Sequence, residues 1–159
     1  MEKSELEPKE VIEFLGFILN SVDMTVALTP PKIEKIENLA SQILSQKRFS
    51  VRFLAQFMGN CVASFPAVEF GPFHTKEIEI CKIQALKQNF WDFEAYMSLC
   101  DWATHHVKWW RENIRTHKVH TLSLVAPPNK EQIHLFTDAS TTGWGAFFPL
   151  TGQKKVVYG

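Results

Sequence analysis

The sequence predicts an α+β protein with a β-hairpin near its N-terminus, a helical body and a small sheet at its C-terminus. Two β-prone apolar runs precede residue 30, and apolar residues at helical spacing follow from residue 31. Short strand-like runs separated by glycine-containing turns begin after residue 131. The 159 residues are enough for one or two domains with a core of their own.

Composition narrows the class of protein. Hydrophobic residues make up 45% of the chain and charged residues 21%, which is typical of a globular rather than a disordered protein. The acidic N-terminus does not resemble a secretion signal, so we expect an intracellular protein, cytoplasmic or nuclear. The odd number and wide spacing of Cys61, Cys81 and Cys100 favour reduced thiols over a disulfide framework.

The formal net charge is zero, but charge is unevenly distributed along the chain. Residues 1–46 hold four Lys or Arg against eight Asp or Glu, whereas residues 47–76 and 102–129 each hold four against one. Alternating charge of this kind is usually a solvated surface. It permits a polyanionic partner but does not by itself predict one.

Turn and cap residues predict the first elements. Val11–Leu19 and Met24–Leu28 are β-prone runs, and residues 20–23 between them predict a hairpin turn. Pro30 and Pro31 suit the first turn of a helix. The apolar residues that follow predict an amphipathic helix to about residue 46, with its buried face at Ile33, Ile36, Leu39, Ala40, Ile43 and Leu44.

A second helix is predicted from the N-cap Ser50 to Pro66, which ends it. Stepping about 100° per residue gathers small and polar side chains into one arc, and apolar side chains occupy nearly all the rest. The arc consists of Arg52, Gln56, Gly59, Asn60 and Ala63. Gly59 costs about 1 kcal/mol against alanine in a helix interior, so either a neighbouring backbone or a ligand should come close there. An ordinary solvent-facing strip with a packing glycine is the alternative.

The later elements are predicted from the same signals. Residues 66–76 should be a loop, Lys76–Phe90 a third helix and Phe93–Ile114 a fourth. The fourth helix should bury Tyr96, Leu99, Ala103, Val107, Trp110 and Ile114, and Trp109-Trp110 favours core packing over base stacking. Residues 116–130 look like a linker, and three short strands are then expected at Ile133–Phe136, Trp144–Phe148 and Lys155–Tyr158.

Several motifs resemble retroelement reverse transcriptases. Phe14-Leu15-Gly16-Phe17-Ile18, followed by a hairpin, a proline and a helix with spaced isoleucines, is similar to the palm-to-thumb junction, whose hairpin grips the primer strand. The helix over residues 50–64 resembles the thumb helix that follows the minor groove of the template–primer duplex. Gly59 stands where a glycine permits close approach in that family. Val107-Lys108-Trp109-Trp110 resembles the segment that leads into ribonuclease H.

The C-terminal part resembles the first two strands of a ribonuclease H domain through Leu135-Phe136-Thr137-Asp138-Ala139-Ser140 and Gly143-Trp144-Gly145-Ala146. In that family the aspartate that closes the first strand ligates the catalytic metals, which makes Asp138 the candidate catalytic and metal-binding residue. The order and spacing of the motifs are similar to those of DIRS-type, tyrosine-recombinase retrotransposons. The resemblance covers nearly the whole chain from about residue 11.

The resemblance implies a domain organisation. Residues 1–30 would be a palm-edge, primer-grip-like hairpin, residues 31–115 a helical thumb and connection, and residues 116–130 a linker. Residues 131–159 would be an incomplete ribonuclease H-like sheet.

The resemblance also implies a nucleic-acid partner, either an RNA–DNA hybrid or a DNA duplex, with the rest of the polyprotein where that is expressed. The residues expected to contact it by shape and phosphate binding are Phe14, Gly16, Lys47, Arg48, Arg52, Gln56, Gly59, Asn60 and Arg111. Arg111 belongs to a basic stretch, with Lys108, Arg115 and Lys118, that would extend the track.

The sequence departs from the family where chemistry is concerned. Two-metal catalysis needs clustered carboxylates. No Tyr-x-Asp-Asp motif occurs, and no Asp or Glu follows Asp138. We therefore expect Mg²⁺, the cofactor of the family, not to bind stably here, and the chain to be inactive alone as an RNA-directed DNA polymerase or ribonuclease H.

Three other interpretations stay open at this point. A host-retained remnant acting as a protein-interaction or structural module is one alternative, and a truncated gene model is another. A zinc site is a third, because the chain carries several histidines and cysteines. No CxxC or HxxxH spacing supports that site, whose candidate ligands are Cys100, His105, His106, His117 and His120.

Overall fold

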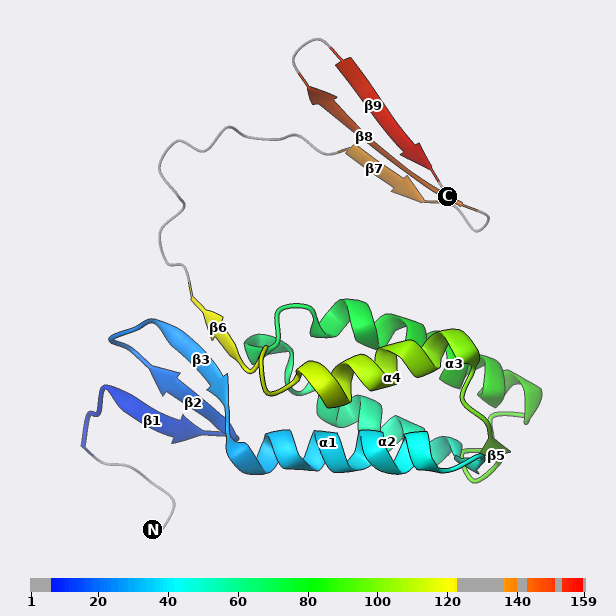
Figure 1. Ribbon diagram of the computed structural model, residues 1–159, viewed down its shortest axis with the longest axis horizontal. Coiled ribbons are helices and arrows are strands. Elements are labelled where there is room, and N and C mark those ends of the chain that lie inside the picture. Colours follow the sequence, from blue (N-terminus) through cyan, green and yellow to red (C-terminus); the bar gives the residue numbers. More distant parts are fainter. Residues whose placement is uncertain (1–6, 123–135, 140–142, 151–152, 159) are drawn as a thin grey trace. The chain divides into compact units, whose positions relative to one another are not determined.

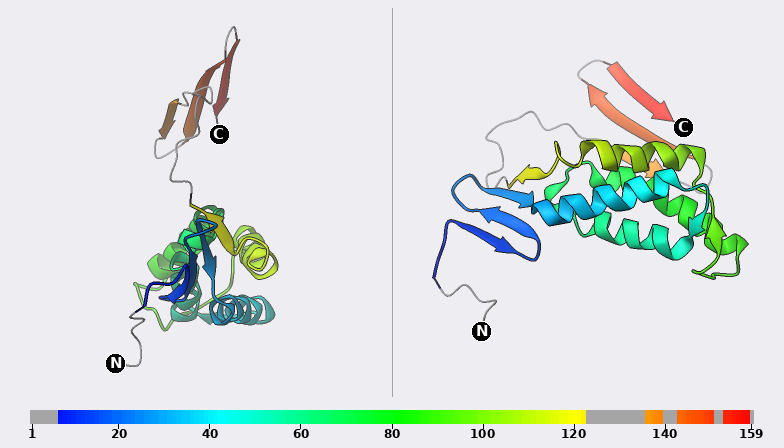
Figure 2. Two further views of the ribbon diagram at one scale, coloured as in Figure 1. Left: turned by 90° about the vertical axis from the view of Figure 1, so that its left-hand side faces the viewer. Right: turned by 60° about the horizontal axis from the view of Figure 1, so that its bottom comes forward.

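The computed structural model describes residues 7–122, 136–139, 143–150 and 153–158. The chain divides into two compact units, Met1–Ser123 and Leu124–Gly159. In the first unit, four helices form a bundle with a small antiparallel sheet at one end (Figures 1 and 2). No helix in the described part of the chain combines the length and the apolarity needed to cross a bilayer.

The first unit contains, in chain order, β1 (Val11–Phe14), β2 (Phe17–Asn20), β3 (Thr25–Leu28), α1 (Pro30–Ser45), β4 (Phe49–Ser50), α2 (Val51–Val62), the 3-10 helix η1 (Phe65–Ala67), α3 (Gly71–Gln88), β5 (Tyr96–Met97), α4 (Asp101–Asn113) and β6 (Val119–Thr121). Its larger sheet has the order β1-β2-β3-β6, and β4 pairs with β5. The second unit is the sheet β7-β8-β9, formed by Phe136–Ala139, Trp144–Leu150 and Gln153–Tyr158. Every pairing among the described strands is antiparallel.

The first two helices form where the sequence predicts them. Pro30 and Pro31 lie in the first turn of α1, and the buried residues of this helix follow the expected spacing. The hydroxyl of Ser50 accepts a hydrogen bond from the N–H of Phe53 at 3.2 Å, which caps α2. An N-cap of this kind stabilises a helix by about 1 kcal/mol.

The four helices pack in a ring: α1 against α4, α4 against α3, α3 against α2 and α2 against α1. Consequently α2 and α4 lie diagonally across the bundle. The core between them is apolar, and its largest fully buried side chains include those of Trp110, Phe57, Ile36 and Leu54. Complete burial of a side chain of this size contributes about 1.5–3 kcal/mol.

The first predicted strand, Val11–Leu19, is wrong as a single element. Leu15 and Gly16 adopt positive φ angles of 51° and 78°, and they form a two-residue turn that pairs β1 with β2. Two consecutive residues with positive φ match the twist of antiparallel strands, which is why such turns close hairpins. The predicted turn at residues 20–23 does join two strands, β2 and β3.

The third and fourth helices were predicted with wrong starts. α3 begins at Gly71, because Pro72 is compatible with a first helical turn, so the predicted loop over 66–76 is too long. α4 begins at Asp101 instead of Phe93. Residues 96–97 form β5 instead, and Tyr96, predicted to be buried, is exposed. Ala103, Val107, Trp110 and Ile114 are fully buried as predicted.

The predicted linker and thiols also need correction. Val119–Thr121 is not part of a linker but forms the strand β6, which pairs with β3. The first unit therefore extends to residue 123. Cys81 and Cys100 form a disulfide between α3 and the residue before α4, so only Cys61 among the three cysteines is free, and it is buried. Burial raises the pKa of the Cys61 thiol.

The second unit contains the three expected strands with shifted bounds. Residues 133–135 of the first expected strand lie outside the described residues, and β7 runs from Phe136 to Ala139. Pro149 and Leu150, which follow the expected strand Trp144–Phe148, also belong to β8 and pair with Lys154 and Gln153. The α+β class is therefore correct.

Candidate nucleic-acid interface

The polar arc predicted for the second helix lies on the outer face of α2. Arg52, Gln56, Gly59 and Ala63 are exposed, and Asn60 is half-buried. We call these five residues the α2 face. A Cβ atom added to Gly59 would meet no heavy atom within 4 Å among the described residues. Within that part of the chain Gly59 is thus not a packing glycine, and the α2 face is open over about 16 Å at 1.5 Å per residue.

At the C-terminal end of α2, Lys32 connects the α2 face to the β1–β2 turn. Its Nζ donates a hydrogen bond to the carbonyl oxygen of Ala63 at 2.8 Å and lies 3.7 Å from the ring centroid of Phe17. Its Cδ is 3.3 Å from the position that a Cβ of Gly16 would take. Burial lowers the pKa of Lys32. The predicted residue Gly16 therefore lies beside the α2 face, and the preceding Phe14 is exposed at the end of β1.

At the N-terminal end of α2, Arg52 lies between the helix and the segment that precedes β5. Its Nε forms an ion pair with Oε1 of Glu94, and its guanidinium carbon lies 5.9 Å from the ring centroid of Phe93. Lys47 and Arg48 are exposed just before β4. Nη2 of Arg48 donates to the carbonyl oxygen of Tyr96 at 3.2 Å.

The ion pair with Glu94 leaves Arg52 largely available to bind a phosphate group. Both side chains are about two-thirds exposed, at 67% for Arg52 and 66% for Glu94. An exposed pair of this kind contributes about 0–1 kcal/mol. A phosphate group that approaches the α2 face can therefore replace Glu94 at a small cost.

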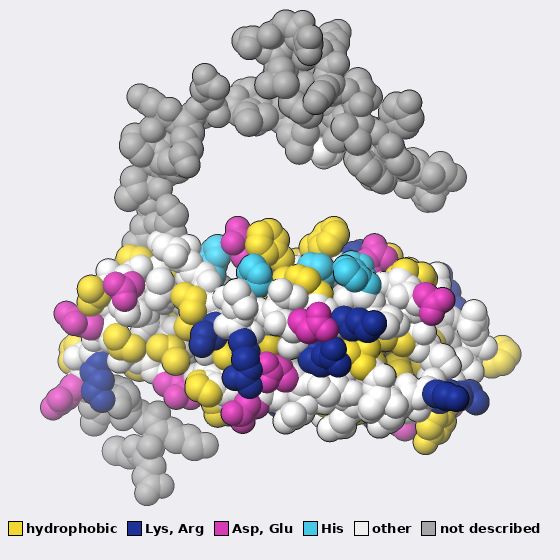
Figure 3. All heavy atoms as spheres, in the orientation of Figure 1, with side chains coloured by type: hydrophobic (Ala, Val, Ile, Leu, Met, Phe, Trp, Pro, Cys, Tyr) yellow, Lys and Arg dark blue, Asp and Glu magenta, His cyan; other side chains and the backbone are white. Residues whose placement is uncertain are grey.

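Arg111 does not join this surface. It lies on α4, diagonally across the bundle from α2, and its Nη2 contacts Oε1 of Glu112 at 2.8 Å. Farther along the chain, Nη2 of Arg115 pairs with Oε2 of Glu37 on α1 at 2.6 Å. Figure 3 shows Lys and Arg side chains interleaved with Asp and Glu on the face over α1 and α4. The expected extension of the basic track along α4 is therefore not continuous with the α2 face.

Asp138 lies in β7 of the second unit, opposite Gly145 of β8, and its side chain is exposed. The position near the end of the first strand of the unit is the one expected from the sequence. No group of three or more His, Cys, Asp or Glu residues that could hold a metal ion occurs among the described residues. Since the donor set of a two-metal site is not assembled there, we derive no catalytic step through Asp138.

Three of the histidines considered as zinc ligands, His105, His106 and His117, belong to an aromatic cluster at the α3–α4 contact, whereas His120 lies in β6. His74 stacks on Trp109, with ring centroids 3.8 Å apart, and His117 stacks on Trp109 with ring centroids 5.7 Å apart. The Nδ1 atoms of His74 and His106 are 3.0 Å apart. Burial, and then the neighbouring His106, His105 and His117, lower the pKa of His74 to about 4. Burial also lowers the pKa of His106, against the opposing effect of Glu77. Figure 3 shows histidines beside apolar side chains along this edge.

Sequence reasoning missed Lys32, Phe93 and Glu94, the residues that frame the α2 face. Lys32 and Ala63 are 31 residues apart, and Arg52 and Glu94 are 42 apart. Helical periodicity reports only on neighbours within one element, so it contains no information about these pairs. The density of aromatic residues between 90 and 96 was the one available signal.

Comparison with known proteins adds no relative. No protein-family model, no curated protein and no solved structure matches the chain. A function for this chain is therefore inferred from its motifs and from the geometry of the α2 face.

Proposed function

We propose that this chain is the thumb and connection region of a retrotransposon reverse transcriptase, extended into the first strands of a ribonuclease H domain. Its role would be to bind the template–primer duplex through the α2 face. The observation that carries the proposal is the open position of Gly59 on that face. A glycine in the interior of an exposed helix costs stability, and close approach of a ligand backbone offsets that cost.

The surroundings of the α2 face support the same role. The exposed β1–β2 turn lies at one end, joined to it by Lys32, and Lys47, Arg48 and Arg52 lie toward the other end. A duplex bound along the helix would meet small and polar side chains in the middle and cations at the ends. This distribution suits contact by shape and phosphate charge instead of base readout.

A salt series tests the proposal. Fluorescence anisotropy would measure the binding of a blunt RNA–DNA hybrid to the wild type, Arg52→Ala and Arg115→Ala. Loss of one phosphate contact in Arg52→Ala should flatten the log–log salt dependence by about 0.9, taking the B-form value for the hybrid. Arg115 is the matched control, because it is also an exposed arginine paired with a glutamate but lies on the α1–α4 side.

The outcomes separate the alternatives. An unchanged salt dependence in Arg115→Ala, together with a flatter one in Arg52→Ala, supports the α2 face. A flatter dependence in Arg115→Ala alone would move the interface to α4. No binding of the hybrid by the intact chain at low salt would exclude the proposal and favour a protein-interaction or structural module.

A further inference from the structure

The segment between α3 and β5 displays four aromatic side chains at the surface. We call residues 90–96 the aromatic loop. Phe90 is 95% exposed, Trp91 60% and Tyr96 63%, and Phe93 is also exposed. Large aromatic side chains normally contribute stability by leaving water, so a cluster of exposed ones within seven residues needs another explanation.

The backbone of the aromatic loop is held at both ends. The N–H of Trp91 donates to the carbonyl oxygen of Leu86 at 2.8 Å. The N–H groups of Arg52 and Val51, in the first turn of α2, donate to the carbonyl oxygens of Phe93 at 2.8 Å and Ala95 at 3.0 Å. These bonds tie the loop to α3 and α2, so its side chains are presented from a fixed backbone.

Two of the aromatic residues also have an unfavourable conformation. Phe90 has a φ of 51° and Trp91 a φ of 63°. This left-handed region is disfavoured for residues that carry a Cβ, and bulky side chains are rare there. Strain of this kind commonly accompanies binding sites, and here it accompanies exposed rings, not buried ones.

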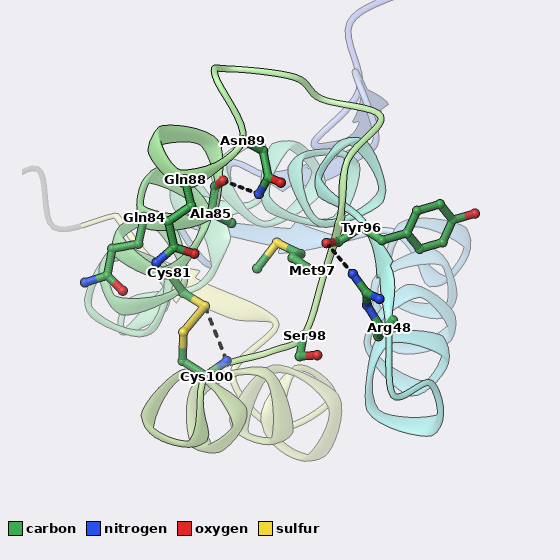
Figure 4. A pocket seen from close by; sticks show the side chains of 10 residues that line it. All are labelled: Arg48, Cys81, Gln84, Ala85, Gln88, Asn89, Tyr96, Met97, Ser98 and Cys100. Atoms are coloured by element: carbon green, nitrogen blue, oxygen red, sulfur yellow. Dashed lines mark hydrogen bonds between the residues drawn. A yellow bond between two sulfur atoms is a disulfide. The ribbon is translucent and has the colours of Figure 1, made fainter.

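Cations accompany the rings. The guanidinium of Arg52 lies over Phe93, and that of Arg48 bonds to the carbonyl oxygen of Tyr96. Arg48 and Met97 help to line a cavity of about 540 Å³. Figure 4 shows the ring of Tyr96 pointing away from this cavity. Two carboxylates, Asp92 and Glu94, belong to the loop as well, and Glu94 is paired with Arg52.

We propose that the aromatic loop binds unpaired bases of a nucleic-acid strand where it leaves the duplex on the α2 face. This inference rests on the proposed function, because the loop continues the α2 face at its N-terminal end. Proteins that hold single strands combine aromatic rings, on which bases stack, with cations along the backbone. The loop supplies the rings at Phe90, Trp91 and Tyr96, and Arg48 and Arg52 supply the cations.

The test compares three ligands by fluorescence anisotropy: a blunt RNA–DNA hybrid, the same hybrid with an eight-nucleotide single-stranded overhang, and a free thymidine dodecamer. The variant is Phe90→Asn with Trp91→Gly, which removes two rings and places residues that tolerate positive φ. Phe73→Ala is the matched control, because Phe73 is 68% exposed in the first turn of α3, at the opposite end of that helix from the loop.

The wild type should bind the overhang hybrid more tightly than the blunt one by about 5- to 150-fold for each base that stacks. The double variant should lose this gain and keep the affinity for the blunt hybrid, whereas Phe73→Ala should retain both. Equal binding of all three ligands by the wild type and the double variant would overturn the inference.

The two proposals fail separately. If the blunt hybrid does not bind but the dodecamer does, and only with the rings present, the duplex proposal is wrong and the loop inference stands. If vesicles of phosphatidylcholine and phosphatidylserine cosediment with the wild type, only with the rings present, while no oligonucleotide binds, the loop is a membrane contact and the inference is wrong.

Discussion

The contact between α3 and α4 and the outer face of α2 differ in how they are occupied. At the α3–α4 contact, a disulfide joins Cys81 to Cys100, and the Nδ1 atoms of His74 and His106 share a hydrogen bond. A Cβ at Gly71 would lie 2.9 Å from Cη2 of Trp110. On the α2 face, the other helical glycine, Gly59, has no described neighbour at that position.

The difference gives the two glycines different meanings. Both are part of helices, and both cost stability in isolation relative to alanine. Gly71 is explained by the chain itself, because Trp110 and Phe65 occupy the space that a side chain would need. Gly59 is not explained by any described residue. This open position is the observation on which the proposed approach of a duplex depends.

Gly71→Ala is expected to change the free energy of unfolding the most. The new Cβ would lie 2.9 Å from Cη2 of Trp110 and 3.1 Å from Cδ1 of Phe65. Trp110 is fully buried, so its ring would have to shift within the core to accept the new atom. Overpacking of this kind should lower the free energy of unfolding by about 1–3 kcal/mol, measured by urea denaturation. An unchanged midpoint would mean that the α3–α4 contact is as open as the α2 face.

The next largest effect is a pH dependence of the free energy of unfolding, which comes from the hydrogen-bonded pair His74 and His106. That bond needs one neutral imidazole as acceptor, so it cannot persist with both rings protonated. The pKa of His74 is about 4 in the folded chain against 6.5 for the free side chain. Between these values the unfolded chain binds a proton that the folded chain does not, so the free energy of unfolding falls as the pH falls from 6.5 to 4.

His74→Gln should remove this part of the pH dependence. We expect the difference between wild type and variant to change by about 1 kcal/mol across that window, because solvent screens a partly exposed side chain. His120→Gln, in β6 and outside the cluster, is the matched control. If both variants keep the slope of the wild type, the histidine pair does not hold α3 to α4.

Local signals account for what was predictable in the fold. Pro30 and Pro31 start α1, and Ser50 starts α2, through interactions within a few residues. The start of α4 was unpredictable because residues 93–97 are held by α2 and β4, through bonds such as that from Val51 N–H to the carbonyl oxygen of Ala95. Such partners are distant in sequence and leave no periodic trace.

The same limit applies to the site. Periodicity predicted the five residues of the α2 face, since they share one helix, but not the lysine and the aromatic loop at its ends. Arg111 was placed in the interface from charge alone, and only the ring order of the helices separates it from α2. The left-handed conformation of Phe90 and Trp91 has no sequence signal of the usual kind, because neither residue is glycine or asparagine.

The smallest effect on stability, and the most informative about function, is expected at Gly59. Because its side-chain position is open, Gly59→Ala should raise the free energy of unfolding by up to about 1 kcal/mol through helix propensity alone. Gly59→Leu should likewise leave the fold intact, since leucine is also a good helix former. The leucine side chain would nevertheless stand between the α2 face and a bound duplex, so Gly59→Leu should weaken binding of the blunt hybrid while Gly59→Ala weakens it less. Thermal unfolding and anisotropy on the same preparations measure both quantities. A lower midpoint in Gly59→Leu would make Gly59 a packing residue like Gly71, and full binding by a stable Gly59→Leu would remove α2 from the interface.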